Sequence, residues 1–174
     1  MEVEIIRGDI CALDVDVLVN AANPGLRGGG GVDGAIHKAA GPKLLEACRA
    51  LGGCPTGEAR MTEGFSLQAR YVIHAVGPIY IDGLSGEPEA LEAAYRNACV
   101  LVVKHELRSV AFSALSTGVY GYPIQPASRI AVNTVFDAFC DTGIRVVFSA
   151  FNQEVERSLL EALDERTGSS EKRG

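Results

Sequence analysis

The chain has 174 residues, which fits one domain, and its 47% hydrophobic residues are enough to bury a substantial core. It carries 16 Lys and Arg against 22 Asp and Glu, a net charge of −6, which argues against binding duplex nucleic acid or an anionic membrane. No apolar run approaches the roughly 20 residues that span a bilayer, and the N-terminus lacks the charge pattern of a signal peptide. We therefore expect a soluble, cytoplasmic protein and, with no apolar stripe in evidence, a monomer.

The five cysteines stand at positions 11, 48, 54, 99 and 140 and form no CxxC pair. Because most of them fall in apolar segments, they suit buried thiols in a reducing compartment better than disulfides or a zinc site. No group of His, Cys, Asp and Glu shows the spacing of metal ligands either. We expect neither a metal nor a cofactor.

Hydrophobic periodicity predicts strands that alternate with helices. In chain order, the pattern predicts strands at 3–7 and 15–20, helices at 33–40 and 42–51, strands at 60–62 and 71–76, a helix over 88–107, a strand at 109–115, a helix marked by residues 127–139, a strand at 145–151 and a helix at 155–166. This alternation predicts an α/β fold with a largely parallel sheet covered on both faces. The polar tail from Thr167 onward lacks apolar anchors, so we expect a domain at 1–166 and a disordered tail at 167–174.

Two of the expected strands end in polar loops that carry glycine. NAANPGLRGGGGVDG begins at the end of strand 15–20, STGVYGYP follows strand 109–115, and an expected helix follows each loop. Open α/β sheets bind ligands at the carboxyl ends of their strands. A helix N-terminus favours an anion, and glycine lets a phosphate approach the backbone closely. The residues alone therefore predict a ligand that carries a diphosphate.

Other phosphate-binding and catalytic motifs fit less well. Gly29, Gly31 and Gly34 satisfy GxGxxG, but in a dinucleotide-binding fold that run follows the strand directly, whereas residues 21–28 intervene here. No GxxxxGK[ST] occurs, which excludes a P-loop NTPase, and no GxSxG marks a nucleophile elbow. Each glycine-rich loop, taken alone, is also compatible with a purely structural role.

Six segments stand out when they are taken together and in order. They are Gly8-Asp9-Ile10, Asn20-Ala21-Ala22-Asn23, GGGGVDGAIHKAAGP, CPTGEA, HAVGP and STGVYGYP. In this combination the chain resembles the macrodomain family, in particular its MacroD-type branch, from about residue 3 to residue 163. The resemblance implies a three-layer α/β/α fold with a mixed, largely parallel central sheet, and ADP-ribose as the ligand.

The resemblance also implies how that ligand is held. Asp9 would accept a hydrogen bond from the adenine amino group beside the Ile10 backbone, and Phe151 would stack on the adenine. Tyr120 would close over the distal ribose. The remaining contacts would come from two backbone cradles made of Gly30, Gly31 and Val32 on one side and Ser116, Thr117, Gly118, Val119 and Gly121 on the other. From the residues alone, Asp9 is equally a capping carboxylate, and Asn152 is expected to cap the last helix.

Members of this branch hydrolyse the ester between the distal ribose of ADP-ribose and an aspartate or glutamate side chain, or acetate. By resemblance, Asn23 would bind a ribose hydroxyl, Asn20 would shape its loop and contribute to catalysis, and Asp33 would orient or deprotonate the attacking water. The resemblance thus implies an ADP-ribosyl ester hydrolase that acts on mono-ADP-ribosylated proteins or O-acetyl-ADP-ribose. The alternative is a reader that binds ADP-ribose without cleaving it.

The three histidines are harder to interpret. His37 lies four residues after Asp33, on the same face of the expected helix, so it either supports that carboxylate or only packs the loop. His74 lies on an expected buried strand and His105 at the end of an expected helix. We assign no functional role to these two.

Overall fold

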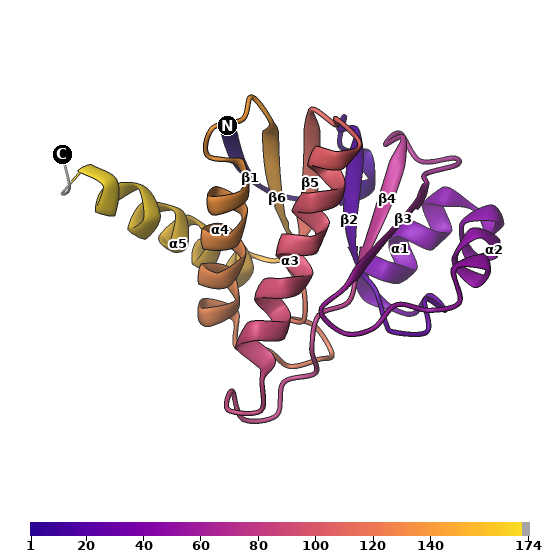
Figure 1. Ribbon diagram of the computed structural model, residues 1–174, viewed down its shortest axis with the longest axis horizontal. Helices are drawn as coiled ribbons and strands as arrows, with labels where there is room; N and C mark the ends of the chain where they lie inside the picture. The colour runs from indigo at the N-terminus through magenta and orange to yellow at the C-terminus, as the bar shows by residue number, and fades with distance from the viewer. Residues whose placement is uncertain (172–174) are drawn as a thin grey trace.

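The computed structural model of the protein describes residues 1–171 (Figure 1). The strands are β1 (Glu2–Arg7), β2 (Val17–Ala21), β3 (Ala59–Glu63), β4 (Tyr71–Ala75), β5 (Ser109–Ser113) and β6 (Arg145–Ala150). The helices are η1 (Ile10–Ala12, a 3-10 turn), α1 (Gly31–Ala40), α2 (Pro42–Leu51), α3 (Glu87–Lys104), α4 (Ile124–Phe139) and α5 (Gln153–Glu171). Each predicted strand and helix is present, and the differences lie at the ends.

Three helices begin or end at other residues than the sequence predicts. Helix α1 begins at Gly31, inside the glycine run and two residues earlier than expected. Helix α3 ends at Lys104 because Glu106 adopts a left-handed conformation, with φ +54°. Helix α5 continues to Glu171, so residues 167–171 of the expected tail belong to its last turns, whereas 172–174 lie outside the described residues.

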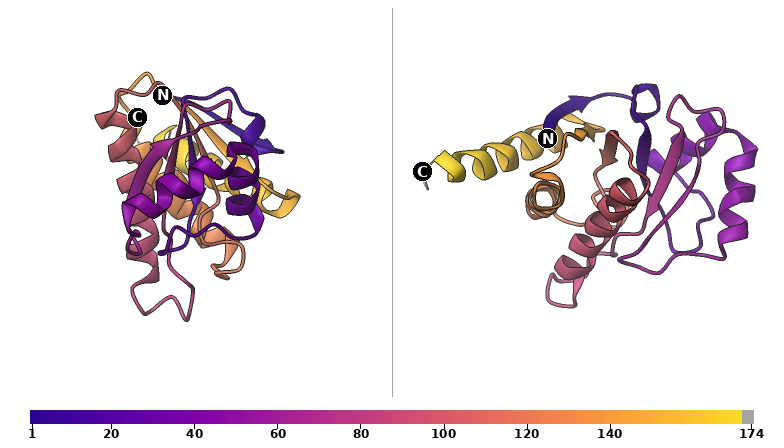
Figure 2. Two further views of the ribbon diagram at one scale, coloured as in Figure 1. Left: turned by 90° about the vertical axis from the view of Figure 1, so that its right-hand side faces the viewer. Right: turned by 45° about the horizontal axis from the view of Figure 1, so that its top comes forward.

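The six strands form one sheet in the order β1-β6-β5-β2-β4-β3. All neighbouring strands are parallel except β3, which is antiparallel to β4, so the predicted mixed and largely parallel sheet is confirmed. Helices α3, α4 and α5 cover one face, and α1 and α2 cover the other (Figures 1 and 2). Strands buried on both faces read as continuous apolar runs, as Val17, Leu18 and Val19 of β2 do.

The central strand β2 lies between β5 and β4. The two glycine-bearing loops follow β2 and β5, which are neighbours. Because the carboxyl ends of parallel strands meet at one edge of a sheet, these loops gather at the same edge, at the bottom of Figure 1. The fold thus brings together the two segments that the sequence marks as a candidate ligand site.

The loop 79–86, which follows β4, is held by a buried carboxylate. Glu87, the first residue of α3, accepts hydrogen bonds at 2.7–3.0 Å from the backbone N–H groups of Ile81, Asp82, Gly83 and Ser85. Burial opposes ionisation, but the backbone donors outweigh it and lower the pKa of Glu87 to about 2. The N–H of Tyr80 also donates to the carbonyl of Tyr120 at 2.9 Å, so this loop braces the loop after β5.

The cysteines are all free thiols, and only Cys140, at the end of α4, is exposed. Burial raises the pKa of Cys48 to about 11 and that of Cys99 to about 12, so both stay protonated at neutral pH. Within residues 1–171, no helix is long and apolar enough to cross a membrane. The same part of the chain holds no group of three or more His, Cys, Asp or Glu side chains arranged to bind a metal ion.

Candidate functional site

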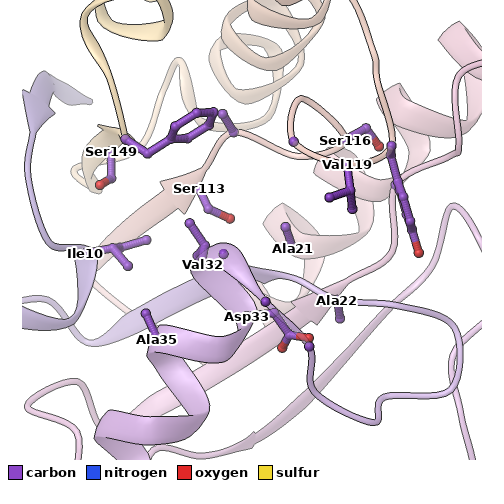
Figure 3. Close-up of a pocket in the computed structure, with 18 of the residues that line it drawn as sticks. Ile10, Ala21, Ala22, Val32, Asp33, Ala35, Ser113, Ser116, Val119 and Ser149 are labelled. Carbon is purple, nitrogen blue, oxygen red and sulfur yellow. The ribbon is translucent and has the colours of Figure 1, made fainter.

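A cavity of about 540 Å³ opens at the carboxyl edge of the sheet (Figure 3). Its walls come from the ends of β1, β2, β4, β5 and β6 and from the first turn of α1. In Figure 3, Ile10 and Ser149 lie toward one end of the cavity, and Ser116 and Val119 lie toward the other. The cavity therefore runs across several strands rather than into the core between two of them.

The N-terminus of α1 forms one wall. The N-cap residue Gly30 offers no side-chain cap, and the first helical hydrogen bond runs from the N–H of Gly34 to the carbonyl of Gly30 at 3.1 Å. The N–H groups of the first turn therefore lack helical partners, and together with the helix dipole they favour an anion. Gly31, with φ +57°, lets the chain turn into the helix at this point.

The loop after β5 forms the facing wall. Its ends are joined by hydrogen bonds from the Tyr122 N–H to the Ser116 carbonyl, at 2.9 Å, and from the Gly121 N–H to the Gly118 carbonyl, at 3.0 Å. The N–H groups of 117–120 have no backbone acceptor among the described residues. Ser116 has φ +65°, and its buried hydroxyl also lacks a partner in this part of the chain. Because a buried unpaired hydroxyl costs about 1–3 kcal/mol, a hydrogen bond from this hydroxyl to a ligand oxygen would be stabilising.

The other end of the cavity is lined by Asp9 and Phe151. Asp9 caps η1, since its Oδ1 accepts a hydrogen bond from the Cys11 N–H at 2.9 Å, and the capping role weighed from the sequence is confirmed. The side chain of Asn152 caps α5 in the same way, accepting from the Val155 N–H at 2.9 Å. This cap ends β6 beside the cavity and leaves Phe151 48% exposed at the rim.

Asp33 is the buried carboxylate of the site. It is 7% exposed and lies in the first turn of α1, near the positive end of the helix dipole. Its Oδ1 accepts a hydrogen bond from Nδ2 of Asn20 at 2.8 Å, and Nε2 of His37 lies 3.4 Å from the same oxygen. Its Oδ2 has no partner among the described residues, so it is the oxygen available to the cavity.

The two asparagines of the loop after β2 act differently. Asn20 is fully buried, does not line the cavity and contacts Asp33 instead. Asn23 lines the cavity and also braces its own loop: its Nδ2 donates to the Gly28 carbonyl at 2.9 Å, and its Oδ1 accepts from the Arg27 N–H at 3.1 Å. One Nδ2 proton of Asn23 is left for a ligand.

Comparison with known proteins identifies the fold. The family described as Macro domain matches residues 19–131. The chain belongs to the macrodomain family. A macro domain-containing protein of Chlorobaculum tepidum is 54% identical over 152 residues, which are 86% of this chain and 88% of that protein.

Two further relatives are informative by name. A Cronobacter sakazakii protein named O-acetyl-ADP-ribose deacetylase is 47% identical over 175 aligned positions, covering 95% of this macrodomain and 97% of that protein. The solved structure of an Oceanobacillus iheyensis macrodomain with ADP is 42% identical and superposes with a TM-score of 0.91, covering 96% of this chain and 92% of that one. The macrodomain fold that the sequence implied is confirmed by this superposition.

Most of the residues predicted to bind the ligand line the cavity of this macrodomain: Asp9, Ile10, Asn23, Gly30, Gly31, Val32, Asp33, Ser116, Gly118, Val119, Tyr120 and Phe151. Four predicted residues do not line it: Asn20, His37, Thr117 and Gly121. Thr117 donates its hydroxyl to the Ala114 carbonyl at 2.9 Å, so it shapes the loop after β5, as Gly121 does with its φ of +71°. His37 reaches the site through Asp33, as a supporting role requires.

Other residues line the cavity of the macrodomain without having been predicted: Gly8, Ala21, Ala22, Gly29, Ala35, Gly77, Ser113, Ala114 and Ser149. Ser113 and Ser149 stand side by side at the ends of β5 and β6, where the rule for parallel sheets would have found them. Gly77 follows β4, and a Cβ there would lie 2.2 Å from Oγ of Ser116. A side chain at position 77 would therefore force the Ser116 hydroxyl to move, and the sequence gives no sign that these two residues meet.

Proposed function

We propose that this macrodomain hydrolyses the ester that joins the distal ribose of ADP-ribose to an aspartate or glutamate side chain or to acetate. The observation that carries the proposal is the carboxylate of Asp33. It is buried, Asn20 holds one of its oxygens, and the other oxygen is available to the cavity. A site that only bound adenine and a diphosphate would not need this carboxylate.

The cavity also suits the rest of the ligand. Unpaired backbone N–H groups of α1 and of the loop after β5 face the same space, so a diphosphate can be bound without a lysine or arginine. Asp9 and Phe151 lie at one end, where a flat base with an amino group fits them. The structure of the Oceanobacillus iheyensis relative with ADP supports this reading.

The chemistry of an aspartate or glutamate ester suits a site with one weak base. Water attacks the anomeric carbon of the distal ribose, the bond from that carbon to the carboxyl oxygen breaks, and the carboxylate leaves with the bonding electrons. A carboxylic acid has a pKa of about 4, so its anion leaves without a general acid. Asp33 then has only to orient the water and accept its proton, and positioning supplies much of the rate.

A second expectation follows from the same chemistry. An arginine-linked ADP-ribose has a guanidine as its leaving group, which must be protonated as it departs. Among the residues that the structure describes, Asp9 and Asp33 are the acidic side chains that line the cavity, and neither acts as a proton donor in this scheme. Arginine-linked substrates should therefore be poor ones.

The test uses a protein mono-ADP-ribosylated on glutamate, and O-acetyl-ADP-ribose, with wild type, Asp33→Asn and Asn23→Ala. We expect wild type to release ADP-ribose and Asp33→Asn to lose about 100-fold or more in kcat. The Kd of Asp33→Asn for ADP-ribose, measured by calorimetry, should stay within about fivefold of the wild-type value. Glu63→Gln is the matched control, since this exposed acid lies at the far end of β3. Tight binding of ADP-ribose without release from either ester would overturn the hydrolase and identify a reader.

A further inference from the structure

A row of polar side chains crosses the sheet beneath α1 and α2. Asn20 of β2 stands directly beside His74 of β4 in the parallel pairing, and Thr62 of β3 lies on the other side of His74. The exposed fractions of Asn20, His74 and Thr62 are 0%, 1% and 9%, so all three side chains are buried. We call these three residues the buried polar row. Oδ1 of Asn20 has no partner among the described residues, so the orientation of this amide depends on the two contacts of its Nδ2 group.

The hydrogen bonds of the row have one consistent assignment. Nδ2 of Asn20 carries two protons, and its two near acceptors are Oδ1 of Asp33, at 2.8 Å, and Nδ1 of His74, at 3.3 Å. Nδ1 of His74 must therefore be unprotonated. The proton is then on Nε2, which lies 3.0 Å from Oγ1 of Thr62 and 3.6 Å from Sγ of Cys48.

A proton on Nδ1 of His74 would be unfavourable in either orientation of the Asn20 amide. If Nδ1 of His74 carried the proton, two donors would face each other across 3.3 Å. Turning the Asn20 amide over would relieve that contact but would set its oxygen 2.8 Å from the carboxylate oxygen of Asp33. Burial, with a smaller effect of His37, lowers the pKa of His74 to about 4, so the ring is neutral at pH 7.

We propose that His74 is a positioning residue of the hydrolytic site: in its Nε2–H form it holds the amide of Asn20 in the one orientation that donates to Asp33. This inference rests on the proposed hydrolase. His74 does not line the cavity, so it touches no ligand and acts only through Asn20. On the other side of the ring, Oγ1 of Thr62 can accept from Nε2–H; because a hydroxyl can donate or accept, the contact with Asn20 is the one that selects the tautomer.

Two substitutions separate this role from simple packing. In His74→Asn, the side-chain oxygen can take the place of Nδ1 and accept from Asn20, but nothing reaches Thr62. In His74→Gln, the amide takes the place of Nε2 and reaches Thr62, but the acceptor for Asn20 is lost. Gln is also the larger side chain and leaves the smaller cavity, so a packing role predicts that Gln is the milder change.

The experiment measures kcat on the glutamate-linked ester, the Kd for ADP-ribose and the melting temperature of each variant. We expect His74→Gln to lose about tenfold or more in kcat, because it has no acceptor for the Asn20 amide. His74→Asn keeps such an acceptor, so its kcat should stay within about threefold of wild type. The Kd for ADP-ribose should stay within about threefold in both, since the ring does not touch the ligand. The reverse order of kcat, with Gln milder than Asn, would overturn the proposal.

A measurement on the wild-type protein decides the case if the variants fail to fold. The ¹⁵N chemical shifts of the His74 ring should show a protonated Nε2 and a bare Nδ1 at pH 7. A protonated Nδ1 would refute the assignment even in a protein without activity. A wild type that has this tautomer but releases nothing from either ester would refute the hydrolase and, with it, the positioning role.

Discussion

Glycine 34 offers a sharp test of how the glycine run is packed. It lies inside α1, where a change from Gly to Ala normally stabilises a helix by up to about 1 kcal/mol. In this protein a Cβ at position 34 would lie 2.4 Å from the carbonyl oxygen of Gly29. We therefore expect Gly34→Ala to destabilise the protein, against the usual sign.

The size of the effect follows from that contact. A Cβ approaches other atoms to no less than 3.0 Å, so the carbonyl of Gly29, an exposed residue in the cavity wall, must retreat by about 0.6 Å. Overpacking of this kind costs about 1–3 kcal/mol, which outweighs the helix propensity and leaves a net loss of about 1 kcal/mol. For a chain of this size the melting temperature then falls by about 3 °C. Because Gly29 lines the cavity, kcat should fall as well.

The assay combines urea denaturation with turnover of the glutamate-linked ester. The matched control is Gly168→Ala in α5, where an added Cβ would meet no described atom within 4 Å apart from its chain neighbours and the backbone of its own helix. This change should leave stability unchanged or raise it by up to about 1 kcal/mol. A Gly34→Ala protein as stable as the control, with unchanged turnover, would show that the Gly29 carbonyl yields freely and that our account of this wall is wrong.

Three other positions have equally definite expectations. Burial lowers the pKa of His74 from 6.5 to about 4, so this residue's contribution to the free energy of unfolding is complete above pH 6.5. That contribution falls by up to about 1.4 kcal/mol per pH unit as the pH drops toward 4. In denaturant titrations between pH 4.5 and 7, His74→Gln should therefore show a weaker dependence of stability on pH. Glu87→Gln replaces one acceptor oxygen by a donor, so amide hydrogen exchange in loop 79–86 should become about tenfold faster or more. In wild type the same loop should loosen only as the pH falls from 4.5 through about 2, where Glu87 takes up a proton. Unchanged exchange in the variant would argue against a loop held by Glu87. Phe151→Ala should lower ADP-ribose affinity about tenfold by calorimetry while the melting temperature changes little, because the ring is half exposed, and equal affinity would exclude stacking.

The architecture was predictable because local signals agree with one another. The apolar run of β2 predicts a strand buried on both faces, and the glycines after it mark where the chain must turn. The direction of β3 was not predictable, because alternation in a segment as short as 60–62 says nothing of its partner. The ends of α3 and α5 were missed by a few residues, since periodicity fades where a helix leaves the core.

The site was predictable where backbone forms it and less so where side chains meet across the sheet. Glycine-bearing loops at strand ends indicate both cradles from sequence alone. The contact of Asn20 with His74 joins residues 54 positions apart and depends on the register of β2 against β4, which no single segment encodes. Asn20 was expected to shape its loop and contribute to catalysis, but its contact with Asp33 could not be predicted; alternation along β2 turns its side chain under α1, toward that carboxylate.

The central place of β2 has a consequence for how this site responds to heat. Asn20, which holds Asp33, belongs to a strand paired on both sides and buried on both faces, the kind of segment that exchanges its amide protons only when the whole domain opens. Local fraying of the chain ends or surface loops therefore leaves the carboxylate in place. Activity and folded structure should disappear together at one temperature, with no inactive folded form between them.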